Sequence, residues 1–138
     1  MPRIARKNIN TNYMHIMIQG IEKKNIFQTK DSKLYYLNIL SKNINEYSNI
    51  YLLAYCIMDN HIHLLFYCDD KQNLSNLMNK TNTSFAIWYN KIKDRVGYVY
   101  RDRYNVQSIK DEQHLFNSLS YIHNNPVKSK MVDEMSES

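Results

Sequence analysis

The features that this sequence lacks argue against a membrane protein and against a disulfide-bonded secreted one. No apolar run among its 138 residues reaches the roughly 18 residues of a membrane-spanning helix. Residues 1–12 are basic and polar, and they lack the apolar segment of a secretion signal. There are two cysteines and no Cys-x-x-Cys pair. These absences predict a soluble, cytoplasmic protein.

The two cysteines, Cys56 and Cys68, are expected to stay reduced. They lie on the two predicted arms of a hairpin that turns near Asn60. In such a hairpin Cys56 faces the neighbourhood of His63 and not Cys68. We therefore expect two thiols packed in the core rather than a disulfide.

The chain carries a moderate number of charged residues, with a small excess of basic side chains. There are 18 Lys and Arg against 13 Asp and Glu, which gives a net charge of +5 and a pI of about 9.1. Basic proteins of this size often bind polyanions, but charge alone does not separate nucleic-acid binders from other basic proteins. We expect one domain over residues 1–138, with 1–12 as a basic arm and 133–138 as a loose tail.

Hydrophobic periodicity predicts an alternation of strands and helices. The predicted elements are a strand over Tyr13–Gln19, a loop over 22–30, a helix from Asp31 to about Tyr47, a hairpin of Ile50–Met58 and Ile62–Tyr67, a helix from Asn73 to a stop at Gly97, an extended segment Val99–Ile109, and a helix from Asp111 to near Pro126. The order β-α-β-β-α-β-α is typical of an α+β protein with a ferredoxin-like or RRM-like antiparallel sheet. Many functions use this architecture, so the function has to be sought in a site.

The first candidate site is the pair His61 and His63 on the second arm of the hairpin. Residues i and i+2 of a strand point to the same face with Cα atoms about 6.5–7 Å apart, so both imidazoles can reach one metal ion. Ile62 and Leu64 point the other way, into a core. A bare His-x-His is also compatible with surface or hydrogen-bonded histidines.

The second candidate site lies on the last predicted helix. Leu115, Leu119 and Ile122 form its core stripe. Tyr121 and Asn125 lie one turn apart on a neighbouring, polar stripe. Tyr121 therefore combines a nucleophilic hydroxyl with a polar neighbour. With twelve tyrosines in the chain, spacing alone is equally compatible with a half-buried packing residue.

Four blocks, in order along nearly the whole chain, resemble one family. They are MPRIAR at Met1–Arg6, CIMDNHIHLL at Cys56–Leu65, YRDRY at Tyr100–Tyr104 and YIHNNPVK at Tyr121–Lys128. Together they resemble the HUH-type single-tyrosine transposases, in particular the insertion-sequence-200-like group and its REP-associated relatives. His-x-His alone is unspecific, whereas the four blocks together are specific.

The resemblance implies a role for each residue of the candidate site. His61 and His63 would bind a divalent metal, Mg²⁺ or Mn²⁺, with Asn125 completing its ligands. Tyr121 would attack a phosphodiester, leaving a 5′-phosphotyrosine and a free 3′-hydroxyl. Family members act on single-stranded DNA with hairpins near element ends. The resemblance thus implies a metal-dependent DNA nickase and strand transferase.

The resemblance also bears on where the protein acts and on its oligomeric state. The protein would act in the bacterial cytoplasm, on DNA at the nucleoid. Insertion-sequence relatives work as dimers that exchange the tyrosine helix, while REP-associated relatives can be monomers. A homodimer and a monomer therefore both stay open.

The resemblance also indicates candidate DNA contacts, and the sequence departs from the family pattern at two positions. The candidate phosphate contacts are Arg3, Arg6, Arg101, Arg103 and Lys128. Tyr100 and Tyr104 can stack on bases, although core packing is the favoured role. Asp59 stands where the family usually has proline, and Gln19 replaces the usual basic residue before the glycine of the first strand.

Two other classes of function remain for this sequence. One is a hairpin DNA- or RNA-binding module on the same fold, with its chemistry unused. The other is a metal-dependent hydrolase that uses His61 and His63 without a covalent step. The intact set of His61, His63 and Tyr121 favours the transposase.

Overall fold

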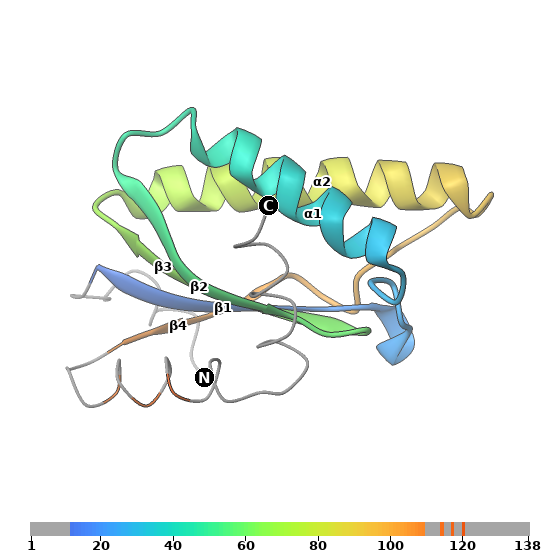
Figure 1. Ribbon diagram of the computed structural model, residues 1–138, viewed down its shortest axis with the longest axis horizontal. Helices are drawn as coiled ribbons and strands as arrows, with labels where there is room; N and C mark the ends of the chain where they lie inside the picture. The colour runs from blue at the N-terminus through green and yellow to red at the C-terminus, as the bar shows by residue number, and fades with distance from the viewer. Residues whose placement is uncertain (1–11, 110–113, 115–116, 118–119, 121–138) are drawn as a thin grey trace.

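The computed structural model describes residues 12–109 together with His114, Asn117 and Ser120. Two helices cover one face of a four-stranded sheet (Figure 1). In chain order the elements are β1 Tyr13–Gln19, the 3-10 turn η2 Ile21–Lys23, α1 Lys30–Ile44, β2 Ile50–Ile57, β3 His61–Cys68, α2 Lys71–Ile92 and β4 Asn105–Ser108. The sheet order is β2-β3-β1-β4 and every pairing is antiparallel. This is the predicted ferredoxin-like arrangement.

Alternation along β1 and β3 builds the main core. Met14, Ile16 and Ile18 of β1 are at most 2 % exposed. Ile62 and Leu64 of β3 pair with Ile18 and Ile16, and all of them belong to the core cluster that includes residues of α1 and α2. The intervening residues of both strands therefore point to the opposite face of the sheet.

The predicted start of α1 was wrong by two positions. The cap is Thr29, whose side chain accepts a hydrogen bond from the Ser32 amide, and not Asp31. Asp31 instead lies in the first turn, where its charge complements the helix dipole. The helix ends at Ile44, three residues before the predicted end at Tyr47. The first two residues of the predicted loop, Glu22 and Lys23, belong to the 3-10 turn Ile21–Lys23.

The second helix differs from its prediction at both ends. It begins at Lys71, because the side chain of Asp70 caps the amides of Gln72 and Asn73. It ends at Ile92 and not at Gly97, because Asp94 has a φ of 51° and turns the chain out of the helix.

The hairpin forms as predicted, and the segment after α2 forms less strand than predicted. In the hairpin Cys56 pairs with His63, and both cysteines are buried thiols that form no disulfide with each other, as expected. Only Asn105–Ser108 of the predicted extended segment pairs with β1, and Tyr100 adds an isolated bridge to Gly20. In the last predicted helix the described residues are His114, Asn117 and Ser120, and each is helical.

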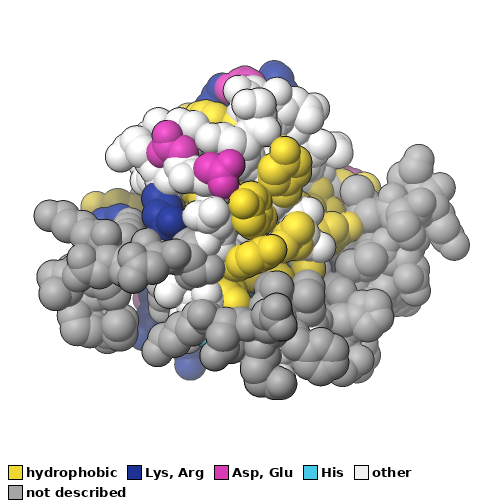
Figure 2. Space-filling model, turned by 90° about the vertical axis from the view of Figure 1, so that its left-hand side faces the viewer, with side chains coloured by type: hydrophobic (Ala, Val, Ile, Leu, Met, Phe, Trp, Pro, Cys, Tyr) yellow, Lys and Arg dark blue, Asp and Glu magenta, His cyan; other side chains and the backbone are white. Residues whose placement is uncertain are grey.

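Hydrophobic side chains gather at the end of the sheet where β2 begins and β3 ends (Figure 2). The exposed large hydrophobic side chains of β2 are Tyr51, 55 % exposed, and Leu53, 44 % exposed. The ring of Tyr51 contacts that of Tyr67 at a centroid distance of 6.1 Å, and Tyr67 contacts Tyr13 at 5.1 Å. This end of the sheet is thus an aromatic ladder remote from the histidine end of β3.

Candidate active site

His61 and His63 lie together on the sheet face that points away from α1 and α2. They begin β3 directly after the hairpin turn, and the register places His61 opposite Gln19 and His63 opposite Met17 of β1. Their ring centroids are 5.0 Å apart and the rings are nearly perpendicular, at 85°. The structure therefore brings the two predicted metal ligands side by side, as the i, i+2 spacing indicated.

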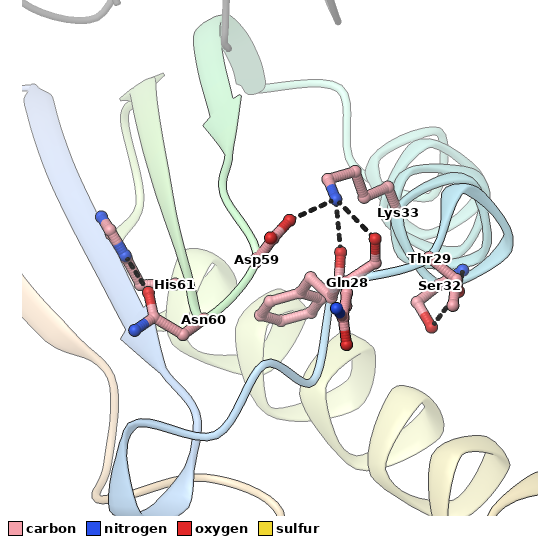
Figure 3. Close-up of polar contacts among 8 residues, drawn as sticks. Gln28, Thr29, Ser32, Lys33, Asp59, Asn60 and His61 are labelled. Atoms are coloured by element: carbon pink, nitrogen blue, oxygen red, sulfur yellow. Dashed lines mark hydrogen bonds and ion pairs between the residues drawn. The ribbon is translucent and has the colours of Figure 1, made fainter.

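A neighbouring amide orients the imidazole of His61. Its Nδ1 lies 2.7 Å from Oδ1 of Asn60 (Figure 3). Because an amide oxygen only accepts hydrogen bonds, Nδ1 carries the proton and Nε2 carries the lone pair. Metal-binding histidines commonly have this arrangement, in which one ring nitrogen donates to an oxygen and the other faces the ion.

A third histidine, His15 of β1, belongs to the same cluster. Its Nε2 lies 3.0 Å from Nδ1 of His63, and the two rings stack with centroids 5.1 Å apart. His15 pairs with Leu65, so it meets His63 diagonally across the two strands. His15 was not among the predicted site residues. The alternation of β1 places it on the correct face, but its contact with His63 follows only from the strand register.

The surroundings keep these imidazoles neutral. Burial lowers the pKa of His61. Burial, followed by the neighbouring His15 and His61, lowers the pKa of His63 to about 4. The pKa of His15 is also lowered, by burial and then by His114. Neutral imidazoles are the form that ligates metal ions, so this donor set fits a divalent cation.

The remaining donor of the predicted metal site is not among the described residues. Asn125, the predicted third ligand, and Tyr121, the predicted nucleophile, both lie outside them, as do Arg3, Arg6 and Lys128. Within the part of the chain that the structure describes, no group of three His, Cys, Asp or Glu is arranged to hold a metal ion. In the last predicted helix the described residues His114, Asn117 and Ser120 are helical.

The turn that carries His61 is anchored to α1 by a buried lysine. Nζ of Lys33 donates to Oδ1 of Asp59 at 3.0 Å, to the carbonyl oxygen of Phe27 at 2.6 Å and to that of Gln28 at 3.2 Å (Figure 3). The amide of Phe27 donates in turn to the carbonyl oxygen of Asp59 at 2.8 Å. The ion pair between Lys33 and Asp59 thus links the turn before His61 to α1.

Gln19, at the end of β1, contacts a basic residue from a later part of the chain. Nη1 of Arg101 donates to Oε1 of Gln19 at 3.1 Å, and the amide of Arg101 donates to the carbonyl oxygen of Gln19 at 2.9 Å. Since Gln19 pairs with His61, Arg101 places a positive charge two strands away from that histidine. Arg103 is exposed on the same segment.

The tyrosines of the YRDRY block pack in the core. The hydroxyl of Tyr100 donates to the carbonyl oxygen of Asn82 at 2.8 Å, and burial raises its pKa. Tyr104 is 8 % exposed, and its hydroxyl donates to Oγ of Ser75 at 3.3 Å. Both residues pack as expected, with Tyr104 in the core cluster and the half-buried Tyr100 against it.

The chain carries a His-x-His strand on a ferredoxin-like sheet. The family model described as "Transposase IS200 like" matches residues 8–125. The match covers most of the chain, so the chain belongs to the IS200-like transposase family. A comparison with curated proteins finds no match.

Solved structures of two transposase-related proteins share the fold. One is a REP-associated tyrosine transposase bound to a REP hairpin, with a TM-score of 0.67, 11 % identity, and coverage of 88 % of this chain and 70 % of that one. The other is a candidate transposase from Deinococcus radiodurans R1, with a TM-score of 0.58, 14 % identity, and coverage of 84 % of this chain and 92 % of that one.

None of the helices within the described residues is long and apolar enough to cross a membrane.

Proposed function

We propose that this transposase nicks and rejoins single-stranded DNA at hairpin-associated sites through a covalent bond between Tyr121 and the DNA. The observation that carries the proposal is the cluster of neutral imidazoles, His61 and His63 with His15 behind them, in a chain of the IS200-like family. A pair of oriented lone pairs on one strand suits metal-assisted phosphodiester chemistry.

His61, His63 and Asn125 would hold Mg²⁺ or Mn²⁺. When bound, the ion supplies Lewis-acid polarisation of the phosphate and offsets negative charge in the transition state. Asn60 fixes the ring of His61, and His15 fixes that of His63, through the hydrogen bonds at 2.7 and 3.0 Å. These contacts orient the imidazoles before DNA arrives, so less order has to be gained on binding.

Tyr121 would carry out the covalent step. Its phenolic oxygen attacks phosphorus, the bond from phosphorus to the 3′-oxygen breaks, and the departing 3′-oxygen takes up a proton. The phenolic proton passes to solvent, and a 5′-phosphotyrosine and a 3′-hydroxyl remain. The phosphodiester bond is exchanged rather than hydrolysed, so a 3′-hydroxyl from another end can reverse the attack and join strands without ATP.

Hairpin DNA is the substrate that we propose for this site. The REP-associated structure that shares this fold is bound to a REP hairpin. The net charge of +5 and the exposed Arg101 and Arg103 favour a polyanionic partner. Arg3, Arg6 and Lys128 would add further phosphate contacts.

The decisive experiment replaces Tyr121 with Phe. The change removes one oxygen and keeps the ring, so stability and strand affinity should stay near those of the wild type. Cleavage of single-stranded hairpin DNA from the flanks of the gene, with Mn²⁺ or Mg²⁺, should fall to background. A metal-dependent hydrolase would keep its activity in Tyr121→Phe, and an unused binding module would show none in either protein.

Mass spectrometry of the adduct gives an independent result. The wild type should form a denaturation-resistant protein–DNA adduct with the nucleotide on Tyr121. A nucleotide on any other tyrosine would show that the nucleophile has been chosen wrongly. Absence of an adduct with correct flanking DNA would remove the covalent mechanism altogether.

A further inference from the structure

A groove of about 590 Å³ lies between α2 and the segment that follows it. We call it the α2 groove and define it by Asn79, Asn82, Thr83 and Ile87 of α2 together with Tyr98, Arg101 and Arg103 of the later segment. Its volume is in the range of small-molecule binding sites. Neither the histidine cluster nor the predicted tyrosine helix accounts for it.

The two walls of the groove offer different chemistry. The helix wall presents amide and hydroxyl groups from Asn79, Asn82 and Thr83. The hydroxyl of Tyr36 donates to Oδ1 of Asn82 at 2.7 Å, which fixes that amide and leaves its NH₂ group as the donor. Exposed hydrophobic surface is also present, since Ile87 is 65 % and Tyr98 is 83 % exposed. Amides beside an exposed aromatic ring are the groups that bind an unstacked base.

The wall that carries Tyr98 is held in place before any ligand binds. Nη1 of Arg95 donates to Oδ1 of Asn90 at 2.6 Å, and its Nη2 donates to the carbonyl oxygen of Tyr98 at 3.0 Å. Nδ2 of Asn90 donates to the carbonyl oxygen of Gly97 at 3.0 Å. Gly97 itself has a φ of 99°, which favours glycine. A fixed turn reduces the ordering cost of binding at Tyr98.

The groove lies on the helix side of the sheet, and the histidine pair lies on the opposite face near the same end of β1. Arg101 lines the groove and bonds through its backbone to Gln19, and Gln19 pairs with His61. Two strand spacings therefore separate Arg101 from His61, about 10 Å. Arg101 and Arg103 provide two positive charges there against the single carboxylate of Asp102, whose Oδ1 accepts from the amide of Arg103. A DNA strand bound at the histidines therefore reaches the groove by passing round the sheet edge at Arg101.

We propose that the α2 groove binds one unpaired nucleotide of the DNA strand on which the enzyme acts. Its base stacks on Tyr98, its edge is bonded by Asn79, Asn82 or Thr83, and its phosphates contact Arg101 and Arg103. The proposal rests on the proposed function, since it needs single-stranded DNA at the histidine pair. The groove would then select unpaired sequence beside a hairpin, in addition to the phosphodiester chemistry.

The test measures binding alone, in EDTA, so that cleavage does not enter. The probes are fluorescein-labelled eight-mers of thymidylate and an abasic eight-mer with the same number of phosphates, followed by fluorescence anisotropy on the full chain. Tyr98→Ala should weaken binding of the thymidylate probe about 5- to 100-fold and leave the abasic probe unchanged. Tyr98→Phe should restore binding, because the ring remains. Arg101→Ala should weaken both probes alike.

Tyr51→Ala is the matched control, since Tyr51 is also an exposed tyrosine but lies on β2 at the other end of the sheet. It should change neither probe. Equal loss on both probes in Tyr98→Ala, or no loss, would overturn the groove proposal. So would a wild-type dimer that Tyr98→Ala dissociates, because the groove would then bind protein. If the wild type binds neither probe but does bind a hairpin oligonucleotide from the flanks of the gene, only the groove proposal fails. If it binds none of the three, the proposed function itself fails.

Discussion

The two faces of the sheet carry different kinds of side chain, although the same strands supply both. On the helix side, β1 and β3 contribute apolar side chains such as Ile16 and Leu64, which have no exposed surface. On the other side the same strands contribute His15 and His63, which bond to each other. The first face is held by non-directional packing. The second combines a small apolar cluster of Cys56, Leu65 and Ile109 with hydrogen bonds that have defined donors and acceptors.

This difference shows which substitutions each face tolerates. A packed face accepts apolar side chains of similar volume, because only shape and area matter there. A face of oriented imidazoles loses its chemistry when one ring nitrogen is misplaced, even if the fold is unchanged. We therefore expect mutations on the two faces to separate stability from activity.

The largest expected effect is loss of cleavage in the double variant His61→Ala, His63→Ala. Metal assistance contributes several kcal/mol to such reactions, so cleavage should fall by about three orders of magnitude or more. DNA binding should be largely intact, because it comes mainly from phosphate contacts. A nicking assay and anisotropy on the same hairpin oligonucleotide measure both. Unchanged Mn²⁺ affinity by calorimetry in this variant would place the metal elsewhere.

The opposite result is expected for Leu64→Ala, one position from His63 on the helix face. Leu64 has no exposed surface, so the cavity should cost about 2–5 kcal/mol of unfolding free energy. Cleavage per folded molecule should be retained. His61→Ala is the matched comparison, and its loss of one hydrogen bond should cost about 1 kcal/mol. Urea unfolding of both variants checks the comparison, which fails if His61→Ala is the less stable protein.

A smaller effect on metal affinity is expected for His15→Ala. Removing a group that orients a metal ligand typically weakens binding about 10- to 100-fold. Calorimetric titration with Mn²⁺ measures the loss directly. His15→Gln, which retains a side chain able to hydrogen-bond to His63, should recover part of it. If His15→Ala binds Mn²⁺ as tightly as the wild type, the bond between His15 and His63 has no role in orienting the ligand.

Asn125→Ala should weaken Mn²⁺ binding less than His61→Ala or His63→Ala does. Water can replace an amide oxygen as a ligand, so the loss should be about 1 kcal/mol, or roughly fivefold. The same titration measures it, with His61→Ala as the reference. A loss equal to that of His61→Ala would mean that the amide is not replaceable by solvent.

The smallest effect is expected for Asp59→Ala at the anchored turn. The side chain of Asp59 is 54 % exposed, and Lys33 keeps its bonds to Phe27 and Gln28, so the cost should be under about 1 kcal/mol. The exposed pair of Lys80 and Glu46 offers a matched control in Glu46→Ala. Thermal unfolding compares the two. A much larger loss in Asp59→Ala would show that the ion pair, and not the backbone, holds the turn.

Most of the fold followed from local rules. Alternation identified β1 and the hairpin, and it also placed His61 and His63 on one face, since that depends only on the two-residue period of a strand. Cys56 opposite His63 followed from the position of the turn. Helix ends were predicted less well. Thr29 and Asp31 are both good caps, and the sequence does not show which one has its side chain beside a free amide.

The contacts that make a site out of these residues depended on tertiary structure. The bond between His15 and His63 joins residues 48 positions apart, and a shift of one residue in the register of β1 and β3 would turn His15 to the other face. The pairing of Arg101 with Gln19 and the α2 groove likewise bring together segments more than ten residues apart. Local patterns determine which face a side chain occupies, because the strand period is a property of the backbone. Which side chain it meets there depends on register and packing, which the whole chain decides.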